Sequence, residues 1–113
     1  MTYDVKPAPT FIKQLEPIIN RYPEIKDYLR RYLGELEETG VKGKRIHGKH
    51  KNFFWKDRFP VKPFGKRKGG RIICYQNPEN PLIIIPAIIY LKSDLSSPTS
   101  KMFKDLLEEI KAL

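Results

Sequence analysis

Residues 54–91 read FWKDRFPVKPFGKRKGGRIICYQNPENPLIIIPAIIYL, and this stretch contains three segments with the pattern of β-strands. In residues 54–62 the side chains alternate between a basic face and a mostly apolar face, which is typical of a half-buried strand. Residues 71–76 and the apolar run 82–91 predict two further strands. The Gly-rich segment 63–70 predicts a basic hairpin loop, and residues 77–81 a turn. These short connections predict an antiparallel three-stranded meander.

The flanking segments have helical periodicity. Residues 3–6 predict a short N-terminal strand, and Thr10 is the expected cap of a first helix that Pro17 kinks or divides. Apolar residues recur at helical spacing from Ile25 to Leu36, and again in a last helix that starts at Ser97 or Ser100. Pro86 predicts a bulge or an unpaired side in its strand. We therefore expect a single α+β domain over residues 1–113, with an N-terminal strand and two helices packed on an antiparallel sheet and a C-terminal helix.

Composition excludes several classes of protein. The single cysteine, Cys74, excludes an intramolecular disulfide and a cysteine-based zinc site. The longest apolar run, Leu82 to Leu91, is about half of what a membrane-spanning helix needs. No signal-peptide pattern opens the sequence, so we expect a cytoplasmic protein without a membrane partner. His47 and His50 have no nearby acidic ligand, and no P-loop spacing occurs, so no metal or cofactor is expected.

The positive charge is concentrated in one segment. Residues 42–71 contain twelve Lys or Arg and one acidic residue, Asp57, whereas the rest of the chain carries ten basic and twelve acidic residues. Such segregation attracts a polyanion, most often nucleic acid. Phe53, Phe54 and Phe64 are interleaved with this charge and are candidates for stacking on unpaired bases. Trp55 and Phe59 fall on the predicted core face, and Tyr75 and Tyr90 fit either the core or a site.

The basic face of the strands is the candidate site. Lys56, Arg58 and Lys62 project from one predicted strand, and Arg71 begins the next. Arginines can bind a phosphate bidentately and stabilise a phosphorane, while RNA supplies its own 2′-OH as nucleophile. A lysine whose pKa neighbouring cations lower is a possible general base, and a tyrosine, a histidine or an arginine-polarised water is a possible acid. The same cations also suit simple binding of RNA or of an acidic protein segment.

Three segments of this chain resemble the RelE/HigB branch of the RelE/ParE toxin superfamily. These are the basic strand 54–62, the Gly-Lys-x-x-Gly-Gly loop that leads into Arg71-Ile72-Ile73-Cys74-Tyr75, and the tail Ile89-Tyr90-Leu91-Lys92 before Ser96. The opening through Pro9-Thr10-Phe11 into a helix is also similar. The resemblance covers nearly the whole chain in the same order.

The resemblance implies a RelE-like microbial RNase fold, metal-independent cleavage of mRNA in the ribosomal A site, and neutralisation by an antitoxin. It implies that Lys56, Arg58, Arg71 and Lys92 belong to the catalytic set. The C-terminal tyrosine of some family members has no counterpart after Lys92, and Tyr90 is the nearest candidate for that role. The expected RNA-contacting set is Lys62, Lys66, Arg67, Lys68 and Phe64. Two alternatives stay open: a ParE-like toxin that acts on DNA gyrase without cleaving RNA, and a plain RNA-binding domain.

Overall fold

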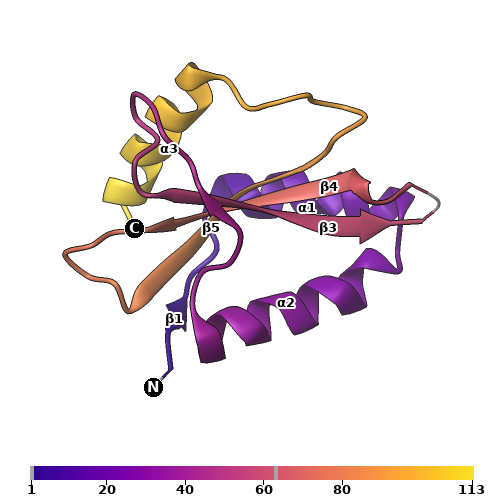
Figure 1. Ribbon diagram of the computed structural model, residues 1–113, viewed down its shortest axis with the longest axis horizontal. Helices are drawn as coiled ribbons and strands as arrows, with labels where there is room; N and C mark the ends of the chain where they lie inside the picture. Colours follow the sequence, from indigo (N-terminus) through magenta and orange to yellow (C-terminus); the bar gives the residue numbers. More distant parts are fainter. Residues whose placement is uncertain (1, 63) are drawn as a thin grey trace.

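The computed structural model describes residues 2–62 and 64–113, so Pro63 of the expected hairpin loop lies outside the described residues. Eight elements follow one another along the chain (Figure 1). They are β1 (Asp4–Val5), α1 (Pro9–Arg21), α2 (Ile25–Thr39), β2 (Lys44–Arg45), β3 (Phe54–Val61), β4 (Gly65–Gln76), β5 (Ile83–Leu91) and α3 (Ser100–Lys111). The expected α+β order is confirmed, with the two-residue strand β2 added to it.

The strands form one sheet in the order β1-β5-β4-β3-β2. The pairs β2–β3, β3–β4 and β4–β5 are antiparallel, as the meander requires, and β1 joins the far edge parallel to β5. The register shifts opposite Pro86, because Ile73 pairs with Ile88 and Cys74 with Pro86. The expected bulge is therefore confirmed, at the residue that cannot donate a ladder hydrogen bond.

Each face of the sheet is covered by a different helical layer, and α2 and α3 lie on opposite sides of the sheet in Figure 1. Phe59, Ile72 and Ile89 face α1 and α2 in one core cluster. Ile73 and Ile88 face the α3 side in the other. Successive side chains of a strand point to opposite faces, so alternate residues feed alternate cores. The helices leave one end of the α3 face uncovered, and this end carries the site.

Phe54 corrects one expectation. Its side chain is 0% exposed and packs in the α3-side cluster. Its ring lies 5.1 Å, centroid to centroid, from that of Phe103 and 5.2 Å from that of Tyr75. Stacking of Phe54 on an unpaired base is therefore wrong, because α3 covers the part of the strand where Phe54 lies.

Helix α1 begins differently from the prediction, whereas α3 begins where it was expected. Helix α1 begins after Ala8, and Thr10 lies inside it instead of capping it. The Thr10 backbone N–H and hydroxyl both donate to the Glu109 carboxylate of α3, at 3.0 and 2.7 Å, so a carboxylate distant in sequence stabilises this helix N-terminus. Helix α1 runs through Pro17 as one element. Thr99 caps α3 through Met102, which agrees with a start near Ser100.

Strand β4 is longer than predicted, because it begins at Gly65 instead of Arg71. Gly65 has φ +72°, which lets the chain reverse immediately after β3. Gly69 lies close to the backbone of β3, because a Cβ at this position would lie 2.5 Å from the Phe59 carbonyl oxygen. Gly65 and Gly70 thus pair with β3 on either side of the basic residues Lys66, Arg67 and Lys68, which lie at a register irregularity between Phe59 and Val61.

Replacing Gly70 by alanine is expected to destabilise the fold. The added Cβ would lie 1.9 Å from the ring of the fully buried Phe59, so the core must shift. Overpacking of this kind costs about 1–3 kcal/mol, which thermal or urea unfolding would detect. The matched control is Gly34→Ala in the interior of α2, where nothing lies within 4 Å of the new Cβ. Gly34→Ala should raise the free energy of unfolding by up to about 1 kcal/mol. Equal stability of the two variants would contradict the assigned packing.

Candidate functional site

Three of the expected site residues form a row across the sheet. Arg58 of β3 pairs with Arg71 of β4, and Arg71 pairs with Tyr90 of β5. Lys56 lies two residues before Arg58, and Lys92 two residues after Tyr90, so the strand period of two brings both to the same face. A backbone hydrogen bond of 2.9 Å from Lys92 to Gly69 extends this pairing. All five residues of the expected catalytic set therefore gather on the α3 face.

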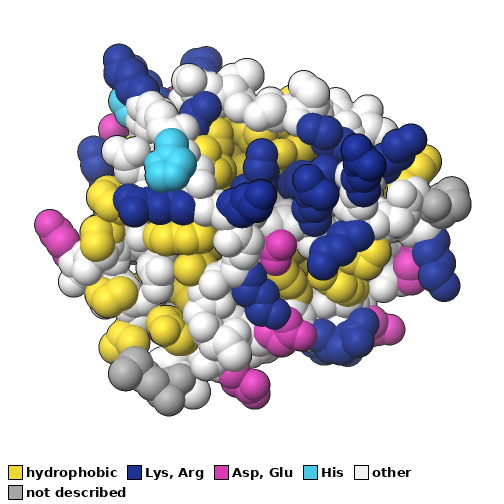
Figure 2. Space-filling model, viewed as in Figure 1, with side chains coloured by type: hydrophobic (Ala, Val, Ile, Leu, Met, Phe, Trp, Pro, Cys, Tyr) yellow, Lys and Arg dark blue, Asp and Glu magenta, His cyan; other side chains and the backbone are white. Residues whose placement is uncertain are grey.

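A groove of about 640 Å³ opens over this row. In Figure 2 the dark-blue side chains crowd over β3 and β4 toward their hairpin. The groove is lined by Gly43, Lys44, Lys56, Asp57, Arg58, Lys66, Arg67, Arg71 and Lys92. Seven of these nine residues are cations, and Asp57 accepts hydrogen bonds from the Tyr32 hydroxyl and the Arg58 backbone N–H. The arrangement provides a concave cationic surface suited to a phosphodiester.

Arg71 lies at the floor of the groove and is only 6% exposed. Its guanidinium donates to the carbonyl oxygens of Gly70 at 2.9 Å and Arg67 at 2.8 Å, with a longer contact of 3.5 Å to Lys66. The side chain therefore holds the first residues of β4 against the sheet. Arg71 can supply positive charge to a bound phosphate, and it also positions the two cations that follow Gly65.

The environment of Lys56 is suited to proton transfer. Partial withdrawal from solvent lowers the pKa of the Lys56 ammonium below its usual value, and the charges of Lys92 and Arg71 lower it further. Arg58 and Lys51 act in the same direction. A lysine with a lowered pKa is neutral in a larger fraction of molecules, which is what a general base requires.

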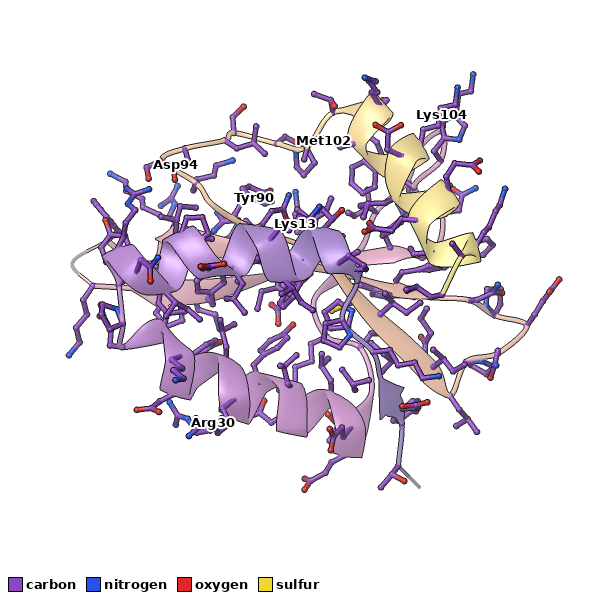
Figure 3. The ribbon with its side chains drawn as sticks, turned by 180° about the vertical axis from the view of Figure 1, so that it is seen from behind. Lys13, Arg30, Tyr90, Asp94, Met102 and Lys104 are labelled. Carbon is purple, nitrogen blue, oxygen red and sulfur yellow. The ribbon has the colours of Figure 1, made fainter. Side chains whose placement is uncertain are left out.

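The structure separates Tyr90 from Lys92: Lys92 lines the groove, whereas Tyr90 is not among the lining residues. Tyr90 is 6% exposed and, in the view of Figure 3, lies between α1 and the connection from β5 to α3. Burial raises the pKa of the Tyr90 phenol, and the Arg71 charge opposes this shift. Tyr90 therefore keeps its proton at neutral pH. The Lys92 ammonium donates to the Ser96 carbonyl oxygen at 2.7 Å, which fixes it at the rim of the groove.

The structure places the expected RNA-contacting residues in two regions, one inside the groove and one outside it. Lys66 and Arg67 line the groove. Lys62 and Lys68 are exposed outside its lining, and Phe64 is 43% exposed with an edge contact to the Tyr22 ring at 6.4 Å. These three positions form an outer basic and aromatic border of the hairpin. Their roles in RNA contact stay predictions.

Sequence reasoning missed Gly43 and Lys44. Gly43 has φ +90°, and a Cβ there would lie 2.1 Å from the Lys56 carbonyl oxygen, so only glycine fits this crossing of β3. The crossing brings Lys44 into register with Lys56. The sequence feature that could have indicated this crossing is the glycine between Lys42 and Lys44. His47 and His50, by contrast, lie in the connection between β2 and β3 and are not among the groove residues.

Within 2–62 and 64–113, no three His, Cys, Asp or Glu side chains are grouped so that they could hold a metal ion. Over the same ranges, no helix combines the length and the apolar character needed to cross a bilayer.

Fold and groove together define a class: small α+β proteins whose mainly antiparallel sheet carries a cationic groove beside a C-terminal helix. Within this class the chain has a RelE-like fold. A structure of a double arginine-to-alanine mutant of Escherichia coli toxin RelE in the free state matches 97% of this chain and 99% of that chain, with a TM-score of 0.58 and 13% identity. No protein-family model and no curated protein matches the sequence. The expected fold is confirmed.

Proposed function

We propose that this protein is the toxin of a type II toxin–antitoxin pair, a metal-independent endoribonuclease that cleaves mRNA on the ribosome in the cytoplasm. The observation that carries the proposal is the groove, in which Lys56, with its lowered pKa, lies beside Arg58 and Arg71. The RelE-like fold supports the same reading. A RelE-like toxin of this kind would have mRNA, ribosomal RNA and an antitoxin as partners, and an acidic antitoxin segment would fit the groove by charge.

The proposed reaction uses the nucleophile of the RNA itself. The 2′-oxygen attacks the adjacent phosphorus, the neutral Lys56 amine takes the 2′-OH proton, and the bond to the 5′-oxygen breaks. Arg58, Arg71 and Lys92 stabilise the negative charge of the phosphorane. The leaving oxygen takes a proton from Tyr90 or from a water molecule that a groove cation polarises. The products are a 2′,3′-cyclic phosphate and a 5′-hydroxyl.

Mapping of mRNA 5′ ends after induced expression tests the proposal. The wild-type chain should produce new cuts in register with the reading frame, and Arg58→Ala should abolish them. The matched control is Arg30→Ala, an exposed arginine on α2 that points away from the sheet in Figure 3. Growth arrest without new ends, together with loss of supercoiling by purified gyrase, would instead support a gyrase-directed toxin. No effect on growth or mRNA would support a plain RNA-binding domain.

The charge of Lys92 should set the pH dependence of cleavage. Lys92→Gln removes one of the charges that lower the pKa of Lys56, so this pKa rises toward its usual value. A general base works in its neutral form, and the rising limb of the pH–rate profile should therefore shift to higher pH. Single-turnover cleavage on programmed ribosomes at several pH values measures this. Lys62→Gln is the control because Lys62 is exposed outside the groove lining. An unshifted limb in Lys92→Gln would contradict the assignment of Lys56.

A further inference from the structure

A second, smaller pocket lies at the other side of the edge strand β2. Lys44 pairs with Lys56 and lines the cationic groove, whereas Arg45 pairs with Trp55. Since successive residues of a strand point to opposite faces, β2 presents one cation to each face of the sheet. The pocket beside Arg45 has a volume of about 300 Å³ and is lined by Arg45, Phe53, Trp55, Gln76, Pro78 and Pro81.

Aromatic rings and a guanidinium form the walls of this pocket. The Arg45 guanidinium carbon lies 5.7 Å from the centre of the Trp55 ring and 5.9 Å from that of the Phe53 ring. Its Nε donates to the Asn52 carbonyl oxygen at 2.7 Å, which helps to hold the guanidinium over both rings. Among the described residues, its terminal nitrogens donate to no acceptor. They are therefore available to a ligand.

Polar groups at the pocket are equally pre-arranged. The Gln76 Nε2 donates to the Pro81 carbonyl oxygen at 2.6 Å, which orients the amide and leaves its Oε1 as an acceptor. Trp55 is only half-buried and belongs to neither core cluster, so the hydrophobic core does not account for it. None of the six lining residues is acidic. Flat aromatic surfaces, a guanidinium and an oriented amide are the groups that bind an unpaired nucleobase.

We propose that this pocket is a nucleobase subsite, in which Trp55 stacks on an unpaired base while Arg45 and Gln76 contact the base edge. The identity of the ligand as RNA rests on the proposed function. The RNA backbone would pass around β2, because Lys44 and Arg45 are consecutive residues that contact the groove and the pocket respectively. The subsite would thus read a base that lies outside the scissile step.

Trp55 is the only tryptophan, so its fluorescence reports this pocket without a label. The probe is a 2′-O-methyl hexa-adenosine, whose blocked 2′-oxygens prevent cleavage. The control is an abasic phosphodiester of the same length, which can occupy the groove and offers nothing to stack. The oligonucleotide should quench Trp55 and the abasic chain should not. Arg45→Ala should reduce the quenching and weaken binding at least about fivefold. The Arg30→Ala control, outside both sites, should bind as the wild type does.

A conservative variant separates stacking from folding. Variants at Trp55 lack tryptophan, so their binding is measured by the fluorescence anisotropy of the same oligonucleotide carrying a dye. Trp55→Phe keeps an aromatic face and should bind within about threefold of the wild type, whereas Trp55→Leu should bind at least about fivefold more weakly. Equal quenching by the abasic chain, or binding without quenching, would overturn the subsite. Quenching by a hexaproline peptide but not by the oligonucleotide would overturn it in favour of a protein partner. If the oligonucleotide quenches Trp55 but the protein makes no cuts in cells, the result would support the subsite and contradict the proposed ribonuclease activity.

Discussion

A chain carrying Lys56→Met is expected to cleave ribosome-bound mRNA at least about 100-fold more slowly than the wild type, because general-base catalysis contributes about 10²–10⁴-fold. Methionine has a similar length and no proton acceptor. Since Lys56 is exposed in the groove and does not belong to a core cluster, the variant should keep its thermal stability. Single-turnover cleavage on programmed ribosomes measures the loss, and sedimentation with ribosomes shows whether binding survives.

Lys56→Arg distinguishes a base from a binding cation. Arginine keeps the positive charge and cannot lose its proton at the pH of the assay. If Lys56 acts as the base, Lys56→Arg should be about as slow as Lys56→Met while it binds ribosomes more tightly. Near wild-type cleavage by Lys56→Arg would show that Lys56 is not the general base and acts only as a phosphate ligand.

Arg71→Ala is expected both to loosen the hairpin and to reduce cleavage at least about 100-fold, as loss of a preorganised charge donor does in other enzymes. The guanidinium is 6% exposed and donates to the carbonyl oxygens of Gly70 and Arg67, so its removal leaves both acceptors without this donor. An unsatisfied buried acceptor costs about 1–3 kcal/mol. Lys66 and Arg67 should then lose their fixed places in the groove lining. Amide hydrogen exchange of residues 65–70, together with cleavage, measures the two effects.

Two matched variants separate the effect of the Arg71 charge from the effect of its hydrogen bonds to the hairpin. Arg67→Ala removes a groove cation but keeps the backbone carbonyl that accepts the Arg71 hydrogen bond, so hairpin exchange should stay at the wild-type level. Arg71→Lys keeps the charge but cannot reproduce the planar fork of donors, so hairpin exchange should remain fast and mRNA cleavage slow. Arg71→Ala with both wild-type exchange and wild-type cleavage would exclude Arg71 from the site.

The strand pattern of residues 54–91 was sufficient to predict the sheet, because alternation with period two is a local property of the chain. Lys56, Arg58 and Arg71 could be placed on one face for this reason, and Pro86 could be assigned to a bulge from its missing N–H. The start of β4 could not be predicted, because residues 65–70 read as a loop and only Gly65 and Gly70 among them pair with β3. Gly65 does so through its positive φ, and Gly70 because it has no Cβ to meet the Phe59 ring.

The α+β class, the meander and the concentration of positive charge could all be derived from the amino-acid sequence. Which cations meet in the groove depends on tertiary contacts. Lys44 reaches the groove because Gly43 fits against the Lys56 backbone, and Lys92 reaches it because β5 pairs with β4. The tertiary structure also buried Phe54 beneath α3 and placed Trp55 beside Arg45 at the opposite face. Side-chain alternation follows from each strand separately, whereas these contacts depend on strand register and helix packing between residues far apart in the chain, which no local pattern specifies.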